Sequence, residues 1–124
     1  EKTKVVNNIG QKPKTFEIDF LNGNDAIEVK WRDATTDGDH ITKEHTRVQV
    51  ISSYDYTPVR IMFYYPQREQ AIKIQQTLKT LYTGVGGKYY GGDEAWDFLK
   101  TYTGIDLKNI LTEIANNNNK VSGN

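Results

Sequence analysis

Two short segments in which apolar and charged residues alternate flank a turn-forming segment near the start of the chain. In TFEIDF (residues 15–20), Phe16, Ile18 and Phe20 alternate with acidic residues, and AIEVKW (residues 26–31) again places its large apolar residues at every second position. This period is that of half-buried β-strands. The segment between them contains asparagine and glycine, which tolerate the positive φ of a tight turn. The sequence therefore predicts an antiparallel hairpin with one apolar and one polar face.

The register of this hairpin decides which charged residues lie together on the polar face, because a slip of one residue turns a strand over. If the turn is centred on residues 23–24, alone or within a four-residue loop, Asp19 lies opposite Glu28. If the turn closes one residue earlier, Asp19 lies diagonal to Glu28. In both registers Asp19, Glu28 and Lys30 form one polar cluster.

Two carboxylates on one face of a hairpin indicate a cation site. Like charges paired across a sheet are unfavourable by up to ~1 kcal/mol, whereas a divalent cation between them makes their proximity favourable. Magnesium is typically held by one or two carboxylates together with phosphate oxygens and waters. A neighbouring lysine such as Lys30 can orient or deprotonate an attacking water, or stabilise charge developing on phosphorus. The alternative without a function is a solvated face with a Glu17–Lys30 ion pair.

The remaining segments predict an α/β fold with a mixed central sheet flanked by helices and a helical C-terminal part, because strands dominate the first half and helical spacing the second. In the helix that begins at Asp39, the predicted inward side carries Ile41, His45 and Val48. The predicted elements are a strand at 4–9, a helix at 40–53, an interior strand at 57–65, a helix at 68–82, a glycine-rich loop at 83–92 and two short helices at 93–104 and 105–115.

The length of 124 residues predicts a single domain with one modest core. We assign residues 1–115 to this domain and residues 116–124 to a disordered polar tail. The chain has no cysteine, so a metal would be held by oxygen or histidine, which favours hard cations such as magnesium. No apolar run is long enough to span a bilayer, and we expect no membrane association and a cytoplasmic, prokaryotic location.

The formal net charge of zero argues against a general nucleic-acid binder, whose domain is usually clearly basic. A metal-dependent nuclease escapes this objection, since the acids of its site offset the basic residues that face the phosphates.

The segments ID and AIEVKW place an aspartate at the end of one strand and Glu-x-Lys in the next, which resembles the PD-(D/E)XK nuclease superfamily. Ile18 stands where that motif usually has proline. A longer block at 26–115, which includes WRDATTDGDHITKEHTRV and PVRIMFYYPQREQAIKIQQTLKTLY, resembles type II restriction endonucleases of the ApaLI kind.

This resemblance implies a restriction-endonuclease-like core and magnesium-dependent cleavage of double-stranded DNA at a short palindromic site, with manganese as a possible substitute. It implies Asp19 and Glu28 as metal ligands and Lys30 as the catalytic lysine. It further implies a homodimer in the full-length enzyme. Because such enzymes are normally longer, we expect this chain to be the carboxy-terminal catalytic part of one.

Four further residues are predicted to contact DNA. Lys43 and Arg47 lie four apart on the helix after the Glu-x-Lys strand, where the alternative is a solvated helix face. Lys88 and Tyr89 lie in the glycine-rich segment, which lacks the Gly-Lys-Ser/Thr order of a phosphate-binding loop.

Two other functions remain open from the sequence. One is a catalytically silent DNA-binding or assembly domain of the same fold. The other is a calcium-binding module, because DATTDGDHITKE, from Asp33 to Glu44, fits the loop of an EF-hand. An EF-hand also needs a helix before the loop, where this sequence predicts a strand. The competing interpretation is that Asp37 and Asp39 cap the following helix.

Overall fold

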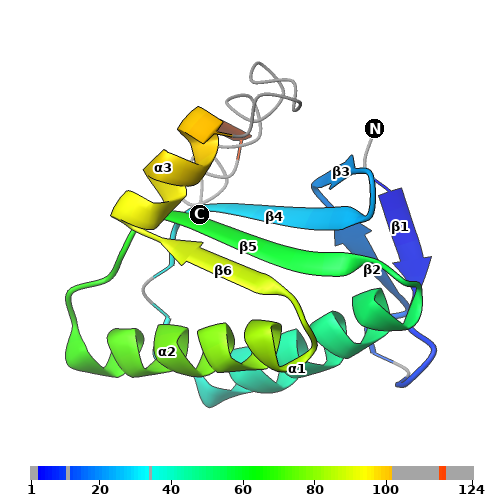
Figure 1. The fold of residues 1–124 in the computed structure, drawn as a ribbon. Coiled ribbons are helices and arrows are strands. Elements are labelled where there is room, and N and C mark those ends of the chain that lie inside the picture. Colours follow the sequence, from blue (N-terminus) through cyan, green and yellow to red (C-terminus); the bar gives the residue numbers. More distant parts are fainter. Residues whose placement is uncertain (1–2, 11, 34, 102–114, 117–124) are drawn as a thin grey trace.

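A computed structural model describes residues 3–10, 12–33, 35–101 and 115–116. Within these residues the chain forms a four-stranded sheet, a separate two-stranded sheet and three helices (Figure 1). The elements are β1 (Thr3–Val6), β2 (Thr15–Ile18), β3 (Phe20–Asn22), β4 (Asp25–Arg32), α1 (Gly38–Ser53), β5 (Thr57–Tyr64), α2 (Glu69–Gly84), β6 (Lys88–Gly91) and α3 (Asp93–Thr101).

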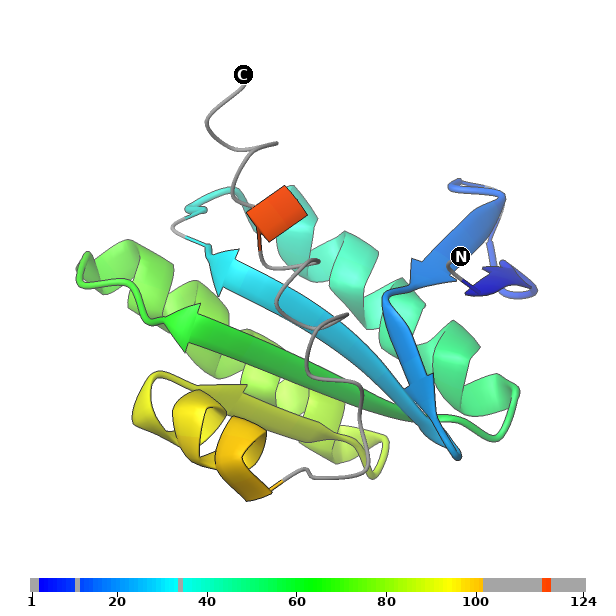
Figure 2. The same cartoon turned by 90° about the horizontal axis from the view of Figure 1, so that it is seen from above.

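The main sheet is mixed and has helices on both faces, which confirms the predicted fold class. Its strand order is β3-β4-β5-β6, with β3 antiparallel to β4 and the other neighbours parallel. Helices α1 and α2 lie side by side on one face, and α3 covers the other (Figures 1 and 2). The predicted helix at 105–115 and the tail at 116–124 lie almost entirely outside the described residues.

The two faces of the sheet differ in chemistry because side chains alternate along each strand. Ile27 and Val29 of β4 join Ile61 and Phe63 of β5 in the apolar cluster under α3. The opposite face of β4 and β5, which α1 and α2 cover, carries charged side chains as well as apolar ones. The interior position predicted for the strand at 57–65 is confirmed, since every residue from Pro58 to Phe63 is buried.

The predicted hairpin is only partly correct, because its first strand is broken at Asp19. The turn has residues 23–24 at its centre, and Leu21 pairs with Ala26, as in the first of the two predicted registers. Before Asp19, however, the chain leaves this sheet, and β2 pairs with β1, which places Glu17 opposite Lys4.

Packing explains the break. Phe16 and Ile18 are buried against the end of α1, whereas Phe20 packs against the cluster under α3. A single straight strand cannot supply both clusters from one face, so the chain turns between them. Asp19 lies at this junction of the two sheets.

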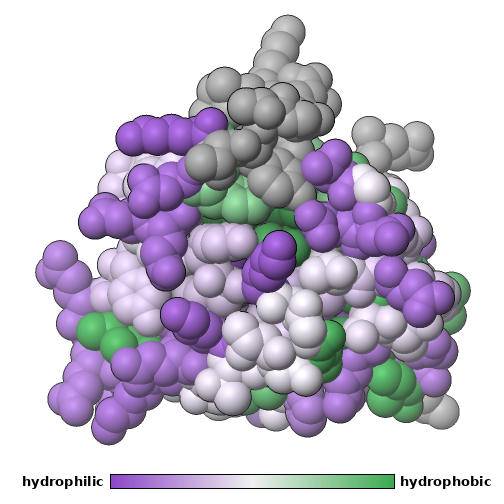
Figure 3. Space-filling view, viewed as in Figure 1, coloured by the Kyte–Doolittle hydropathy of each residue, from purple (hydrophilic) through white to green (hydrophobic). Residues whose placement is uncertain are grey.

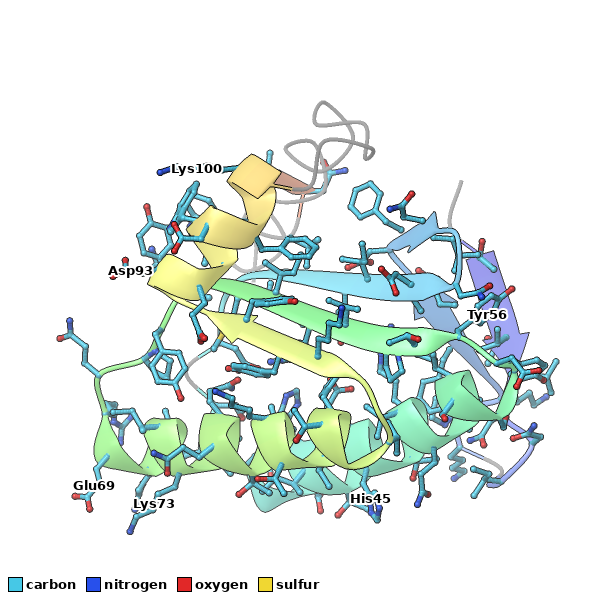
Figure 4. All side chains as sticks on the ribbon, in the orientation of Figure 1. His45, Tyr56, Glu69, Lys73, Asp93 and Lys100 are labelled. Carbon is cyan, nitrogen blue, oxygen red and sulfur yellow. The ribbon has the colours of Figure 1, made fainter. Side chains whose placement is uncertain are left out.

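Helix α1 buries Val48 as predicted, but the prediction that His45 also faces inward is wrong. Asp37 is its N-cap, and the side chain of Asp37 accepts a hydrogen bond from the Asp39 amide at 3.0 Å, which fits the capping interpretation. His45 is exposed and points away from the sheet (Figure 4). The buried residues of the helix are Glu44, Arg47, Val48, Val50 and Ile51.

The glycine-rich segment is not a loop throughout, because its second half forms the edge strand β6. A Cβ on Gly87 would lie 2.3 Å from the Pro58 carbonyl oxygen and 2.8 Å from that of Tyr82. This glycine is therefore required by the close approach of three backbone segments rather than by loop freedom.

Hydrophilic side chains cover much of the face shown in Figure 3, including the outer side of α2. Among the described residues, no helix is long and apolar enough to cross a membrane.

Candidate active site

Asp19 lies beside β4, the strand that carries Glu28 and Lys30. The Oδ2 atom of Asp19 accepts a hydrogen bond of 2.9 Å from the amide of Val29. Because this amide directly follows Glu28, the Asp19 carboxylate lies beside the backbone of Glu28. Lys30 shares a face of β4 with Glu28, and its Nζ is 3.7 Å from Glu28 Oε1. The Lys30 side chain is 35% exposed and that of Glu28 is 14% exposed, so the cluster has one side open to solvent.

Behind this cluster, three neighbouring strands place polar side chains in one row across the sheet. Glu28 of β4 is in register with Arg60 of β5, and Arg60 is in register with Tyr89 of β6. Helices α1 and α2 close over this row and add Glu44 and Tyr82. Arg60 and Tyr82 were not among the site residues predicted from the sequence, and Glu44 was considered only as the last position of a calcium loop.

Arg60 is fully buried and is surrounded by carboxylates. Its Nη1 is 3.0 Å from Glu44 Oε1 and 3.6 Å from Glu28 Oε2, and its Nη2 is 2.7 Å from Asp33 Oδ2. Burial alone would lower the pKa of Arg60, but the charges of Glu28 and the neighbouring acids raise that pKa above its usual value. The guanidinium is therefore a permanent positive charge at the centre of the network.

The two oxygens of Glu28 have different surroundings. Oε2 accepts a hydrogen bond of 2.9 Å from the Tyr82 hydroxyl and lies 3.3 Å from Arg47 Nε. It also faces Arg60. Oε1 faces Lys30 on the partly exposed side. Buried residues thus hold Glu28 through Oε2, while its Oε1 faces Lys30.

Glu28 and Glu44 form a close pair of acids with different protonation. Tyr82 has one hydroxyl proton, yet its oxygen is 2.9 Å from Glu28 and 3.1 Å from Glu44. Burial raises the pKa of Glu28, but Arg47, Lys30 and Arg60 outweigh this effect and hold that pKa well below its usual value. Burial and the charge of Glu28 raise the pKa of Glu44 to about 7, against the opposing effect of the arginines. Glu28 is therefore the ionised member at neutral pH, and Glu44 holds a proton in mildly acidic solution.

Exchange of Glu44 for glutamine is expected to change how the stability of the fold depends on pH. The pKa of Glu44 is raised on folding from 4.5 to about 7, so its contribution to stability is complete below about pH 4.5 and is lost as the pH rises through 7. Relative to Glu44→Gln, the wild-type protein should therefore lose up to ~3 kcal/mol between pH 4.5 and pH 8. Urea unfolding at several pH values measures this difference.

The control for this experiment is Glu69→Gln on the outer side of α2, where the Glu69 side chain is 86% exposed (Figure 4). Its stability difference from wild type should stay constant over the same pH range. A Glu44→Gln difference that is equally constant would contradict the assigned protonation of the buried pair.

The four predicted DNA contacts occupy two kinds of position. Lys43 and Lys88 are exposed. Arg47 is buried, lies beside Glu28 and donates a hydrogen bond to the Glu17 carbonyl, so the alternative of a solvated helix face is wrong for this residue. Tyr89 is also buried, and its hydroxyl donates to Gln75 Oε1 at 2.7 Å. Contact of these four residues with DNA stays a prediction.

The calcium-loop segment does not have the surroundings of an EF-hand. Strand β4, rather than a helix, precedes Asp33. The Asp33 carboxylate pairs with Arg60 and lies 3.1 Å from His40 Nε2, and the last position of the loop, Glu44, is buried within α1. Burial raises the pKa of Asp33, but His40 and Arg60 outweigh this effect and hold that pKa below its usual value. The carboxylate is therefore ionised and already paired.

The chemistry of the cluster suits a hard divalent cation. The described residues contain no group of three or more histidine, cysteine, aspartate or glutamate side chains placed to hold a metal. Magnesium, however, is commonly bound by only one or two carboxylates, with substrate phosphate and water as its other ligands. Asp19, which is bonded to the amide after Glu28, and the Oε1 side of Glu28, which faces Lys30, are two carboxylates that could serve such a cation.

Comparison with known proteins identifies a family. A sequence model described as ApaLI-like restriction endonuclease matches residues 1–116. No curated protein and no solved structure matches the chain.

Proposed function

The chain belongs to the ApaLI-like restriction endonuclease family, and from this premise we propose that it cleaves double-stranded DNA at a short palindromic site in a magnesium-dependent reaction. Asp19 and Glu28 are the proposed metal ligands, and Lys30 is the proposed catalytic residue. Manganese is expected to replace magnesium. The observation that carries this proposal is the position of the Asp19 carboxylate. It accepts a hydrogen bond from the Val29 amide, which lies on β4 between Glu28 and Lys30.

The residues of the cluster have distinct roles in the proposed reaction. The bound metal would act as a Lewis acid at the phosphate and lower the pKa of water. The Lys30 ammonium, held beside Glu28 Oε1, stabilises the negative charge that develops on the phosphate as water attacks. The hydrogen bond from the Val29 amide fixes the Asp19 carboxylate against the strand, so that the position of this carboxylate does not depend on the substrate.

We further propose that the full-length enzyme acts as a homodimer. Cleavage of both strands of a palindrome requires two equivalent sites, and a two-fold dimer places them symmetrically on the two strands. The exposed residues Lys43 and Lys88 are proposed contacts to the DNA backbone, since Lys and Arg supply most of the phosphate contacts in such complexes.

The proposal is tested by incubating supercoiled plasmid DNA with the full-length protein that carries this sequence, with magnesium, with manganese, and with a chelator. We expect discrete fragments with either metal and intact plasmid with the chelator. Binding of the plasmid without cleavage at any metal concentration would instead support the catalytically silent alternative. Cleavage that the chelator does not affect would contradict the metal assignment.

A further inference from the structure

The hydroxyl group of Tyr82 reaches the site from helix α2, which packs on the sheet face that carries Glu28. Tyr82 belongs to the last turn of α2, 54 residues after Glu28 in the chain, and it is 1% exposed. Its ring packs in the apolar cluster between the sheet and the helices, and its hydroxyl is the donor to Glu28 Oε2. The buried tyrosine thus places its hydroxyl between Glu28 and Glu44.

Arg60, on the neighbouring strand β5, forms an ion pair with the same oxygen of Glu28. Its Nη1 lies 3.6 Å from Oε2, and the rest of its guanidinium is fixed by Glu44 and Asp33. The hydrogen bond from Tyr82 and the ion pairs with Arg60 and Arg47 all converge on this oxygen. They restrict rotation of the carboxylate, because turning its plane lengthens all three contacts.

We propose that Tyr82 and Arg60 are positioning residues of the nuclease site: by holding Oε2 of Glu28 inward, they keep Oε1 beside Lys30 as the oxygen that binds the metal. This inference rests on the proposed function, since it gives Glu28 the role of a metal ligand. Hydrogen bonds to ligating carboxylates orient them, and their loss typically weakens metal affinity or activity by about 10- to 100-fold.

The test is the affinity of Tyr82→Phe for manganese, measured by calorimetry without DNA, together with the magnesium dependence of plasmid cleavage. Phenylalanine keeps the buried ring and removes only the hydroxyl. We expect the Kd for manganese to rise by about tenfold or more. The magnesium concentration for half-maximal cleavage should rise in parallel, and cleavage should recover in part at high magnesium.

Tyr54→Phe is the matched control, because it removes a tyrosine hydrogen bond of the same length, 2.9 Å, to the Val6 carbonyl. Its manganese affinity should equal that of the wild type. Arg60→Lys, which keeps the positive charge but loses the forked guanidinium, tests the second contact independently and covers the case in which Tyr82→Phe does not fold. Its Kd should rise in the same direction.

The inference is overturned if folded Tyr82→Phe and Arg60→Lys bind manganese as tightly as the wild type, even if both are less stable to urea. A uniform loss of rate at every magnesium concentration would overturn it too, since that result indicates a purely structural role. Failure of the proposed function has a different signature. In that case the wild-type protein itself binds no manganese, or Asp19→Asn binds it as well as the wild type does.

Discussion

Replacement of Lys30 by alanine is expected to lower the rate of plasmid cleavage by about 10²- to 10⁴-fold while the protein stays folded. The loss follows from the position of the ammonium, which is 3.7 Å from Glu28 Oε1 on the open side of the cluster. The fold should persist because the Lys30 side chain is one-third exposed and its ion pair contributes little to stability. Single-turnover cleavage at saturating magnesium measures the effect on the chemical step.

Lys73→Ala is the control for Lys30→Ala. Lys73 lies on the outer side of α2 with its Nζ also 3.7 Å from a glutamate, Glu69, but its side chain is 71% exposed and distant from the cluster (Figure 4). Its cleavage rate should match that of the wild type. If Lys30→Ala and Asp19→Ala both retain wild-type cleavage, the assignment of this cluster as the nuclease site is wrong.

Replacement of Arg60 by methionine is expected to destabilise the fold by about 3–5 kcal/mol at neutral pH. Methionine has a similar length, so the loss comes from charge rather than from a cavity. Without the guanidinium, the acids that it neutralises, Glu28, Glu44 and Asp33, remain partly buried without their central positive charge. Urea unfolding gives the free-energy difference directly.

Arg68→Met provides the comparison for Arg60→Met. Arg68 is exposed at the beginning of α2, and its side chain makes no capping hydrogen bond, so the change should alter stability by less than about 0.5 kcal/mol. Equal stability of the two methionine variants would show that the buried network is not held by Arg60.

The fold was predictable from sequence where local signals decide it. The mixed sheet and the antiparallel pairing of β3 with β4 follow from alternation and from the residues of the turn, which left two registers open. The break at Asp19 was not predictable in this way, because it depends on which core Phe16 and Phe20 each join. Strand β6 was missed because its glycines were interpreted as loop formers, whereas Gly87 is needed for close backbone packing.

Only the outer part of the candidate site has a local signal in the sequence that groups its residues. Glu28 and Lys30 lie on one strand of the predicted hairpin and Asp19 directly precedes the other, so a local pattern was enough to group them. Arg60 and Tyr82 reach the site through parallel pairing and helix packing, which no local pattern specifies.

Some sequence signal for the inner residues did exist. Glu44, Arg47 and Ile51 share a helical stripe with buried Val48, and Arg60 interrupts the apolar run of β5. A solvated helix face was the alternative considered for Arg47, whereas the structure pairs this residue with Glu28.

The row formed by Glu28, Arg60 and Tyr89 also bears on how the strands find their correct partners during folding. Parallel strands joined by long crossovers form slowly and have no tight turn to fix their alignment. If β5 slipped by one residue, Arg60 would enter the apolar layer under α3, where it would meet no carboxylate of the row. A buried charge in a central strand thus penalises a pairing misaligned by one residue far more than an aliphatic residue would. The guanidinium that we assign to the site therefore also helps to specify the register of β5 in the sheet.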